Sequence, residues 1–164
     1  MTQTAKQPVI DRAAEAAPDQ RLVMRLMAYW EQLSADGACP SLEDFEFDAV
    51  GNLRQHCFLL YFGEDVMNPH FGYVGQTLAD DCGIDLTHKT LADIPRRSLL
   101  TRVADNYLQI LANRCPIGFE GEFTNASGRE VKYRGIIAPF SENGEEIAFV
   151  LGAISCKVVG DTAA

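Results

Sequence analysis

The chain has 164 residues, of which 47% are hydrophobic and 23% charged, enough for one domain with a buried core. Its formal net charge of -9 argues against a nucleic-acid surface, which needs basic residues to displace the counterions of phosphates. The same charge argues against docking on an anionic membrane.

The cysteines are widely spaced, and no C-x-x-C pair occurs, so the sequence predicts neither a zinc ribbon nor another metal site. They are Cys39, Cys57, Cys82, Cys115 and Cys156. Unpaired thiols are typical of a reducing compartment. No apolar run approaches the ~20 residues of a membrane span, and the first residues lack the apolar stretch of a secretory signal. We therefore expect a cytoplasmic protein without membrane contact.

The N-terminal region divides into a tail and a helix. Residues 1–17 are polar and alanine-rich, and we expect a mobile tail. A flanking segment over 18–36 then holds a predicted helix that begins at Asp19, a capping residue, and ends near Ser34. Its apolar residues recur at three- and four-residue steps and form one stripe: Leu22, Val23, Leu26, Met27, Tyr29, Trp30 and Leu33.

An apolar stripe of this width has two possible roles. It covers a sheet of its own chain, or it pairs with the same helix of a second chain. In the second case Trp30 would be a central anchor, because aromatic side chains carry much of the energy of an interface. The interface candidates are Leu22, Leu26, Trp30 and Leu33.

The middle of the chain predicts short elements. A loop with a short helix near 48–55 precedes an apolar strand over 57–62. A second strand follows over 70–74, after an Asn-Pro turn. The stretch 76–94 has no long period and many glycine, aspartate and threonine residues, so we expect two or three short helical turns.

The last third predicts one long helix and a meander. The helix runs over 98–114, with a capping serine at its start. Alternating residues over 117–123 and 131–137 indicate two half-buried strands. The nearly continuous apolar run over 147–156 indicates a central strand buried on both faces. The two intervening turns make these three strands antiparallel neighbours.

Three stretches of the chain carry a family likeness. The first is WEQLSADGACPSLEDF, a tryptophan helix followed by a loop with proline. The second is FGYVGQTLADDCGIDLTHKTLADI, with the pattern G-x-D-L-T, and the third is the closing hairpin GREVKYRGIIAPFSENGEEIAFVLGAI. Over about residues 20–157 they resemble a bacterial stand-alone PAS domain family.

The resemblance implies an α+β fold of the PAS type, a five-stranded antiparallel sheet with helices on one face and an N-terminal flanking helix. Because the leading helices of PAS modules often form a dimer contact, the resemblance also leads us to expect a homodimer through the flanking helix. The PAS domain would cover 40–158, with a tail over 159–164. The chain departs from the family at His88, where the pattern favours glycine after D-L-T. A histidine adopts a positive φ at some cost, so the departure indicates either a changed turn or a specialised site.

The resemblance also implies a cavity between sheet and helices that takes a cofactor or metabolite. The candidate lining residues are Tyr133, Tyr107, His88 and Cys82. Flavin domains place a reactive cysteine near Cys82, but their N-C-R-F-L-Q signature is absent, and Asp81 beside this thiol should raise its pKa. His88 is the one histidine placed to bind haem. We expect neither haem nor flavin, and the cofactor stays unknown.

The sequence carries no nucleotide-binding, hydrolase or metalloprotease motif. We therefore expect a non-catalytic signalling module that senses a small ligand and contacts a protein partner. One alternative is a small α+β cone enzyme of the isomerase or hydratase kind, which would need an Asp–Tyr or Asp–His set inside an apolar cavity, with Asp85, Tyr107 and Tyr133 as candidates. The other is a pure interaction protein with a filled core.

Overall fold

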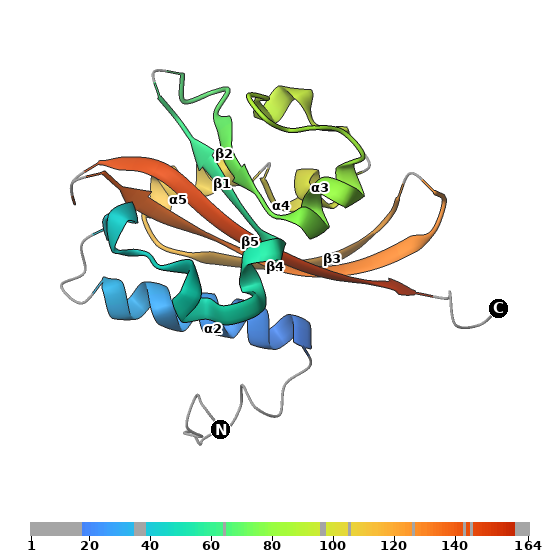
Figure 1. The fold of residues 1–164 in the computed structure, drawn as a ribbon, viewed down its shortest axis with the longest axis horizontal. Helices are drawn as coiled ribbons and strands as arrows, with labels where there is room; N and C mark the ends of the chain where they lie inside the picture. The colour runs from blue at the N-terminus through green and yellow to red at the C-terminus, as the bar shows by residue number, and fades with distance from the viewer. Residues whose placement is uncertain are drawn as a thin grey trace.

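The computed structural model describes residues 18–34, 39–63, 65–95, 98–104, 106–125, 127–142, 144 and 146–159. Within these ranges, five strands form one sheet with helices on both faces (Figure 1). The α-helices are α2 (Pro18–Leu33), α3 (Gln76–Cys82), α4 (Leu99–Ala104) and α5 (Tyr107–Asn113). The strands are β1 (Cys57–Tyr61), β2 (His70–Val74), β3 (Ile117–Thr124), β4 (Glu130–Ser141) and β5 (Ile147–Val159). The 3-10 helices are η1 (Leu42–Asp44), η2 (Phe47–His56) and η3 (Leu91–Asp93).

The sheet is antiparallel throughout, with the order β2-β1-β5-β4-β3. The first and last strands therefore pair at its centre, and β2 and β3 form its edges. The sequence-based prediction of a five-stranded antiparallel sheet is confirmed, as are the final meander and the buried central strand. The predicted tail over 1–17, the helix end at 35–36 and residues 160–164 lie outside the described residues.

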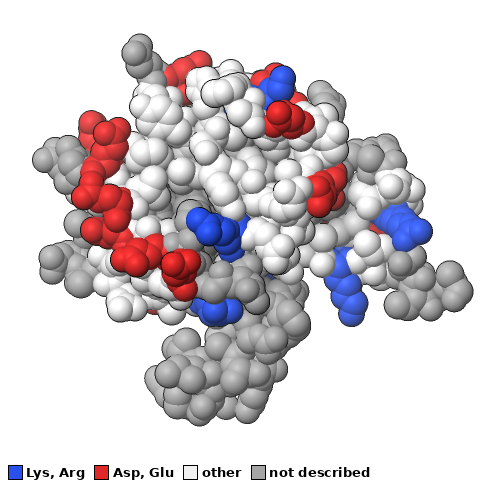
Figure 2. Space-filling model, viewed as in Figure 1, with Lys and Arg blue, Asp and Glu red and all other residues white. Residues whose placement is uncertain are grey.

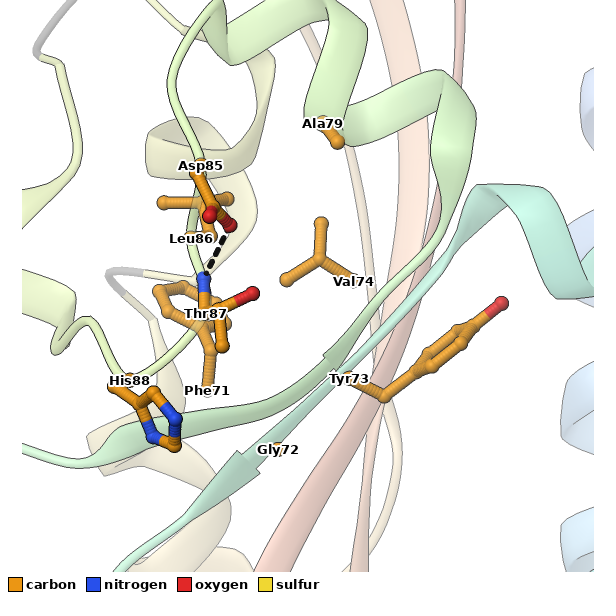
Figure 3. A pocket seen from close by; sticks show the side chains of 9 residues that line it. All are labelled: Phe71, Gly72, Tyr73, Val74, Ala79, Asp85, Leu86, Thr87 and His88. Carbon is orange, nitrogen blue, oxygen red and sulfur yellow. Dashed lines mark hydrogen bonds between the residues drawn. The ribbon is translucent and has the colours of Figure 1, made fainter.

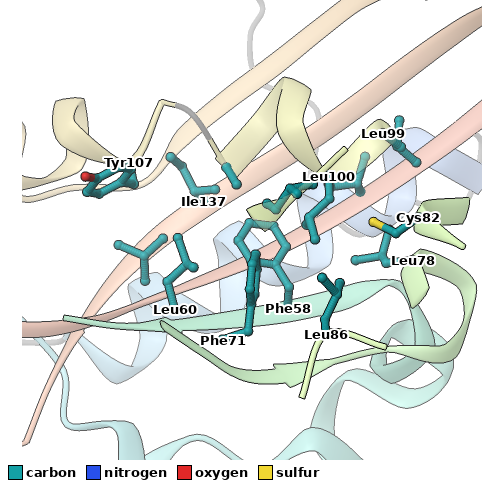
Figure 4. Close-up of a cluster of buried hydrophobic side chains, with 14 of the residues drawn as sticks. Phe58, Leu60, Phe71, Leu78, Cys82, Leu86, Leu99, Leu100, Tyr107 and Ile137 are labelled. Carbon is teal, nitrogen blue, oxygen red and sulfur yellow. The ribbon is translucent and has the colours of Figure 1, made fainter. Parts of the chain in front are cut away.

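The inner face of the sheet packs against α3, α4 and α5 (Figure 4). Large apolar side chains fill this layer and exclude water from it. The fully buried ones include Phe58, Leu60, Leu78, Leu99, Leu100, Ile110, Ile137 and Ile154. The rings of Phe58 and Phe71 meet edge to face, with centroids 6.4 Å apart. Removing this apolar surface from water is the main source of stability on the inner side.

The outer face of the sheet is covered by α2, which lies across β4 and β5. Leu22, Leu26 and Trp30 are 3%, 0% and 7% exposed. The indole Nε1 of Trp30 donates a hydrogen bond to the carbonyl oxygen of Pro139 at 2.8 Å, which satisfies the one polar group of the ring. Leu33 is partly buried in the same layer. The stripe therefore covers the chain's own sheet, and a homodimer through these residues stays a prediction.

The prediction of a single helix over 98–114 is wrong. The structure has two short helices, α4 and α5, and Asn106, just before α5, has a ψ of 9° that lies outside the helical range. The side-chain amide of Asn106 donates to the carbonyl of Arg102 at 3.1 Å, and asparagine often competes in this way with regular helix bonds. α5 then ends at Arg114, which has a left-handed φ of 56° and donates its N–H to Ile110.

The short helical turns expected over 76–94 are present as α3 and η3. Gly83 ends α3 with a φ of 74°, and its N–H donates to the carbonyl of Ala79. This left-handed position explains the glycine, which has no Cβ to clash there. η3 begins with a capping box, in which Thr90 and Asp93 exchange side-chain and backbone hydrogen bonds.

Beyond α2, the outer face of β3, β4 and β5 carries charges. Lys132 lies opposite Glu122 on one side and Lys157 on the other. Arg134 forms an ion pair with Glu120 at 3.1 Å. Figure 2 shows a run of acidic side chains near η1 and the turn between β4 and β5, whereas Lys and Arg are scattered over the rest of this face. The sheet thus has an apolar, covered half and a charged, uncovered half.

Candidate functional site

A groove of about 420 Å³ runs along β2 at the edge of the sheet (Figure 3). β2 forms one wall, the segment 85–88 forms the other, and α3 closes one end. The lining residues are Phe71, Gly72, Tyr73, Val74, Ala79, Asp85, Leu86, Thr87 and His88. This volume falls in the range of small-molecule sites in proteins.

A β-bulge shapes the β2 wall. Leu59 pairs with Tyr73 but Leu60 pairs with Phe71, so Gly72 is an additional residue on β2. The bulge directs Phe71 and Val74 to the inner layer, whereas Tyr73 joins the outer layer. The groove therefore borders residues that belong to both packed layers of the molecule.

The rim opposite β2 is polar. The Oδ1 atom of Asp85 accepts a hydrogen bond from the backbone N–H of Thr87 at 2.9 Å. This bond and the Thr87 hydroxyl lower the pKa of Asp85, with smaller contributions from the charges of Lys89 and His88. The exposed carboxylate is therefore ionised at neutral pH. Figure 3 shows that it lies on the side of the segment that faces Val74.

His88 keeps the left-handed turn that the family pattern assigns to glycine. Its φ is 62°, and its side chain is exposed at the lower end of the groove. Just beyond it, the N–H of Phe71 donates to the carbonyl of Lys89, and the N–H of Leu91 donates to that of Pro69. These bonds tie the end of the segment 85–88 to the start of β2.

Two of the predicted pocket residues lie in the inner layer instead of the groove. Tyr107 is 4% exposed, and its hydroxyl donates to the carbonyl of Val66 at 2.9 Å. Cys82 is buried at the end of α3. Burial raises the pKa of its thiol, Asp81 raises it further, and a hydrogen bond with Ser98 opposes both. A buried, protonated thiol is a poor nucleophile.

Tyr133 lies at a third place, on β4. Its ring covers Gly121 of β3, where an added Cβ would lie 2.8 Å from the phenol oxygen. It also meets Phe123 edge to face, with centroids 6.0 Å apart. Tyr133 lines a second hollow, of about 340 Å³, between charged residues of the uncovered half. Of the four predicted pocket residues, the groove thus contains only His88.

Sequence reasoning missed most of the groove. Phe71, Val74 and Leu86 were not among the predicted site residues, and Asp85 was weighed only as part of an enzyme site. The sequence signal that could have identified these residues is the D-L-T run at 85–87, which follows the predicted strand over 70–74. In the described part of the chain, no group of three or more His, Cys, Asp or Glu is placed to hold a metal ion. Within the same part, no helix is long and apolar enough to cross a membrane.

A family model described as "PAS domain" matches residues 19–155. The chain belongs to this family. The match includes α2, the groove and all or most of every strand of this PAS domain. A comparison with curated proteins gives no match.

Solved structures similar to this PAS domain come from several kinds of protein. The dark structure of the blue-light photoreceptor Aureochrome1 LOV is 16% identical, with coverage of 74% of this chain and 91% of its own and a TM-score of 0.47. The PAS domain of the fruit-fly ELK potassium channel is 11% identical, with coverage of 70% and 96% and a TM-score of 0.47. That of Bordetella pertussis BvgS is 12% identical, with coverage of 65% and 77% and a TM-score of 0.42.

Proposed function

We propose that this PAS domain is a non-catalytic, cytoplasmic sensory module that binds a small ligand in the β2 groove and signals by protein contact. One observation carries the proposal. The groove is lined by a strand whose side chains belong to both packed layers. A ligand there would contact the layer under α3–α5 and the layer under α2 through the same few residues.

A continuous set of contacts supports transmission from the groove to α2. Val74 and Phe71 of β2 pair with Phe58 and Leu60 of β1. β1 pairs in turn with β5, whose outer residue Leu151 is fully buried in the layer under α2. A shift of β2 on ligand binding would therefore press on packed side chains at every step, and packed interiors transmit small displacements.

The arrangement of polar groups supports binding over catalysis. The enzyme alternative needs an Asp–Tyr or Asp–His set in one apolar cavity. Tyr107 and Tyr133 lie away from Asp85, and His88, which lines the same groove, is an exposed residue at its end. A carboxylate that transfers protons at neutral pH also needs a raised pKa. The pKa of Asp85 is lowered, mainly by hydrogen bonds from Thr87.

The test is a small-molecule screen by amide NMR on the full chain, with Ala79→Phe as a variant that fills the groove. Binding compounds should shift the resonances of 71–74 and 85–88 and, more weakly, those of α2. Ala79→Phe should abolish these shifts, whereas Ala112→Phe, at an exposed helical position, should not. Compounds that bind equally well to the Ala79→Phe variant would contradict the groove as the sensory site.

A further inference from the structure

We propose that the groove selects ligands with a small apolar body and a cationic amine, and that Asp85 recognises the amine. This inference rests on the function proposed above and specifies its ligand. It follows from three properties of the groove: where its carboxylate points, what surrounds that carboxylate, and what lies below it.

The carboxylate of Asp85 is held at the mouth of the groove. The backbone N–H of Thr87 binds Oδ1 at 2.9 Å and fixes the side chain on the side facing Val74 (Figure 3). An ionised carboxylate has about four acceptor positions, so contacts from Thr87 leave capacity for a ligand. Because the side chain is already oriented, a ligand need not order it on binding.

Within the described part of the chain, no cation forms an ion pair with this carboxylate. Lys89 and His88 influence Asp85 through space, yet in the residues that the structure describes neither comes close enough for an ion pair with it. An anionic ligand would meet the negative charge of Asp85 and the net charge of -9 of the chain. A cation would be attracted by both.

The floor of the groove is apolar. Phe71 and Leu86 are buried residues of the inner layer, and Val74 packs against that layer. Ala79 of α3 adds a small side chain at the closed end. A ligand body of about the size of one aromatic ring would cover this floor while its amine reaches Asp85. A carboxylate above an apolar floor fits an arylalkyl amine better than a sugar or a phosphate ester.

Three probes of one shape test the proposal on the full chain: phenethylamine, the neutral 2-phenylethanol and the anionic 3-phenylpropionate. We expect phenethylamine to bind at least about tenfold more tightly than the alcohol, because a charged hydrogen bond is the stronger one, and the acid to bind most weakly. The advantage of phenethylamine over the alcohol should shrink between 50 mM and 500 mM salt, because the carboxylate of Asp85 is exposed and its charge is screened. Amide NMR gives both the site and the dissociation constant.

Asp85→Asn separates recognition from folding, because asparagine keeps the oxygen that accepts from Thr87. It should remove the advantage of the amine and leave the binding of the alcohol nearly unchanged. The matched control is Asp93→Asn, because Asp93 is also exposed and accepts a bond from the backbone N–H of a threonine, Thr90, but does not line the groove. This control should bind phenethylamine as the wild type does.

The outcomes distinguish this inference from the function on which it rests. Equal binding of the three probes, no binding of the amine, or an unchanged amine dissociation constant in Asp85→Asn would each overturn the inference. Ligand sensing in the groove would still stand if other compounds bind there and Ala79→Phe excludes them. If Ala79→Phe excludes no groove-binding compound, the function itself fails.

Discussion

β4 and β5 run beneath α2 for one part of their length and past it for the other. In the covered part, their outer side chains are fully buried: Ile136, Ala138, Phe140, Leu151 and Ala153. In the uncovered part, the same face of the same strands carries Lys132, Arg134 and Lys157. The inner side chains stay mostly apolar throughout, with Val131 and Ile154 at the uncovered end.

The difference shows that strand formation and helix docking are specified separately. The alternation that builds the strands continues through both parts, and only the outer positions change from apolar to charged. Stability should therefore be concentrated where α2 lies. The uncovered half should tolerate substitutions better, because its outer side chains are solvated and the ring of Tyr133 is only partly buried.

The largest effect should come from Trp30→Ala. Loss of a buried tryptophan and of its bond to Pro139 should lower the free energy of unfolding by about 3–5 kcal/mol. Glu31→Ala, at an exposed position of α2, is the control and should change it by less than about 0.5 kcal/mol. Urea unfolding followed by circular dichroism measures both. A loss that depends on protein concentration would place the stripe in a dimer contact instead.

High pH should weaken the covered half through Cys57. Burial in the layer under α2 raises the pKa of its thiol to about 12. In the unfolded chain this thiol ionises near pH 8.5, while the folded protein keeps the proton. The free energy of unfolding should then fall by about 1.4 kcal/mol per pH unit between these two pKa values. In Cys57→Ala, the free energy of unfolding should fall less steeply with pH, by this slope. An identical pH dependence in the variant and the wild type would contradict the assignment of the effect to the Cys57 thiol.

A pair of glycines compares the two halves directly, since each lies beneath an aromatic ring of the neighbouring strand. A Cβ at Gly152 would overlap the ring of Phe58, which is fully buried and has no room to move. Gly152→Ala should cost about 1–3 kcal/mol. A Cβ at Gly121 would meet the end of Tyr133, which is partly exposed and can swing away. Gly121→Ala should therefore cost less than Gly152→Ala in thermal unfolding, and equal costs would refute the contrast.

The smallest effect concerns the charges of the uncovered half. Lys132 and Lys157 lie directly opposite each other, a repulsive arrangement across strands. Lys157→Glu should replace repulsion with attraction and raise the free energy of unfolding by about 0.2–1 kcal/mol at low salt. The gain should vanish in 1 M NaCl, where exposed charges are screened. Lys157→Gln serves as the neutral control and should give an intermediate value.

Much of the fold was predictable because it depends on local patterns. The alternation over 117–123 and 131–137 identified strands, and the apolar run over 147–156 identified the centre of the sheet. The prediction of a single helix over 98–114 failed because the apolar spacing continues across Asn106, whose backbone is not helical and whose side chain binds the carbonyl of Arg102. Periodicity detects a buried face but not a local competitor for backbone hydrogen bonds.

The site was less predictable, because it depends on neighbours that are distant in sequence. Tyr107 and Tyr133 combine apolar rings with hydroxyl groups, which suggested a pocket, yet each ring packs elsewhere. The groove requires the bulge at Gly72 and the return of 85–88 beside β2. Neither the bulge nor the return of this segment produces a repeating hydrophobic pattern in the sequence. His88 drew attention because it departs from a family pattern; it lines the groove at a position of positive φ, and its role as a ligand-binding residue stays a prediction.

The hydrogen bond from Trp30 to Pro139 spans 109 residues of chain. Likewise, β1 can form its pairing with β5 only after β5 has been synthesised. During synthesis, α2 therefore emerges long before the strands that receive it. Its apolar stripe stays exposed until the last hairpin leaves the ribosome, and chains with such distant contacts fold slowly and risk aggregation meanwhile. A chain that stops before β5 would lose both the central strand of its sheet and part of the surface on which α2 packs. We therefore expect quality-control proteases to remove it.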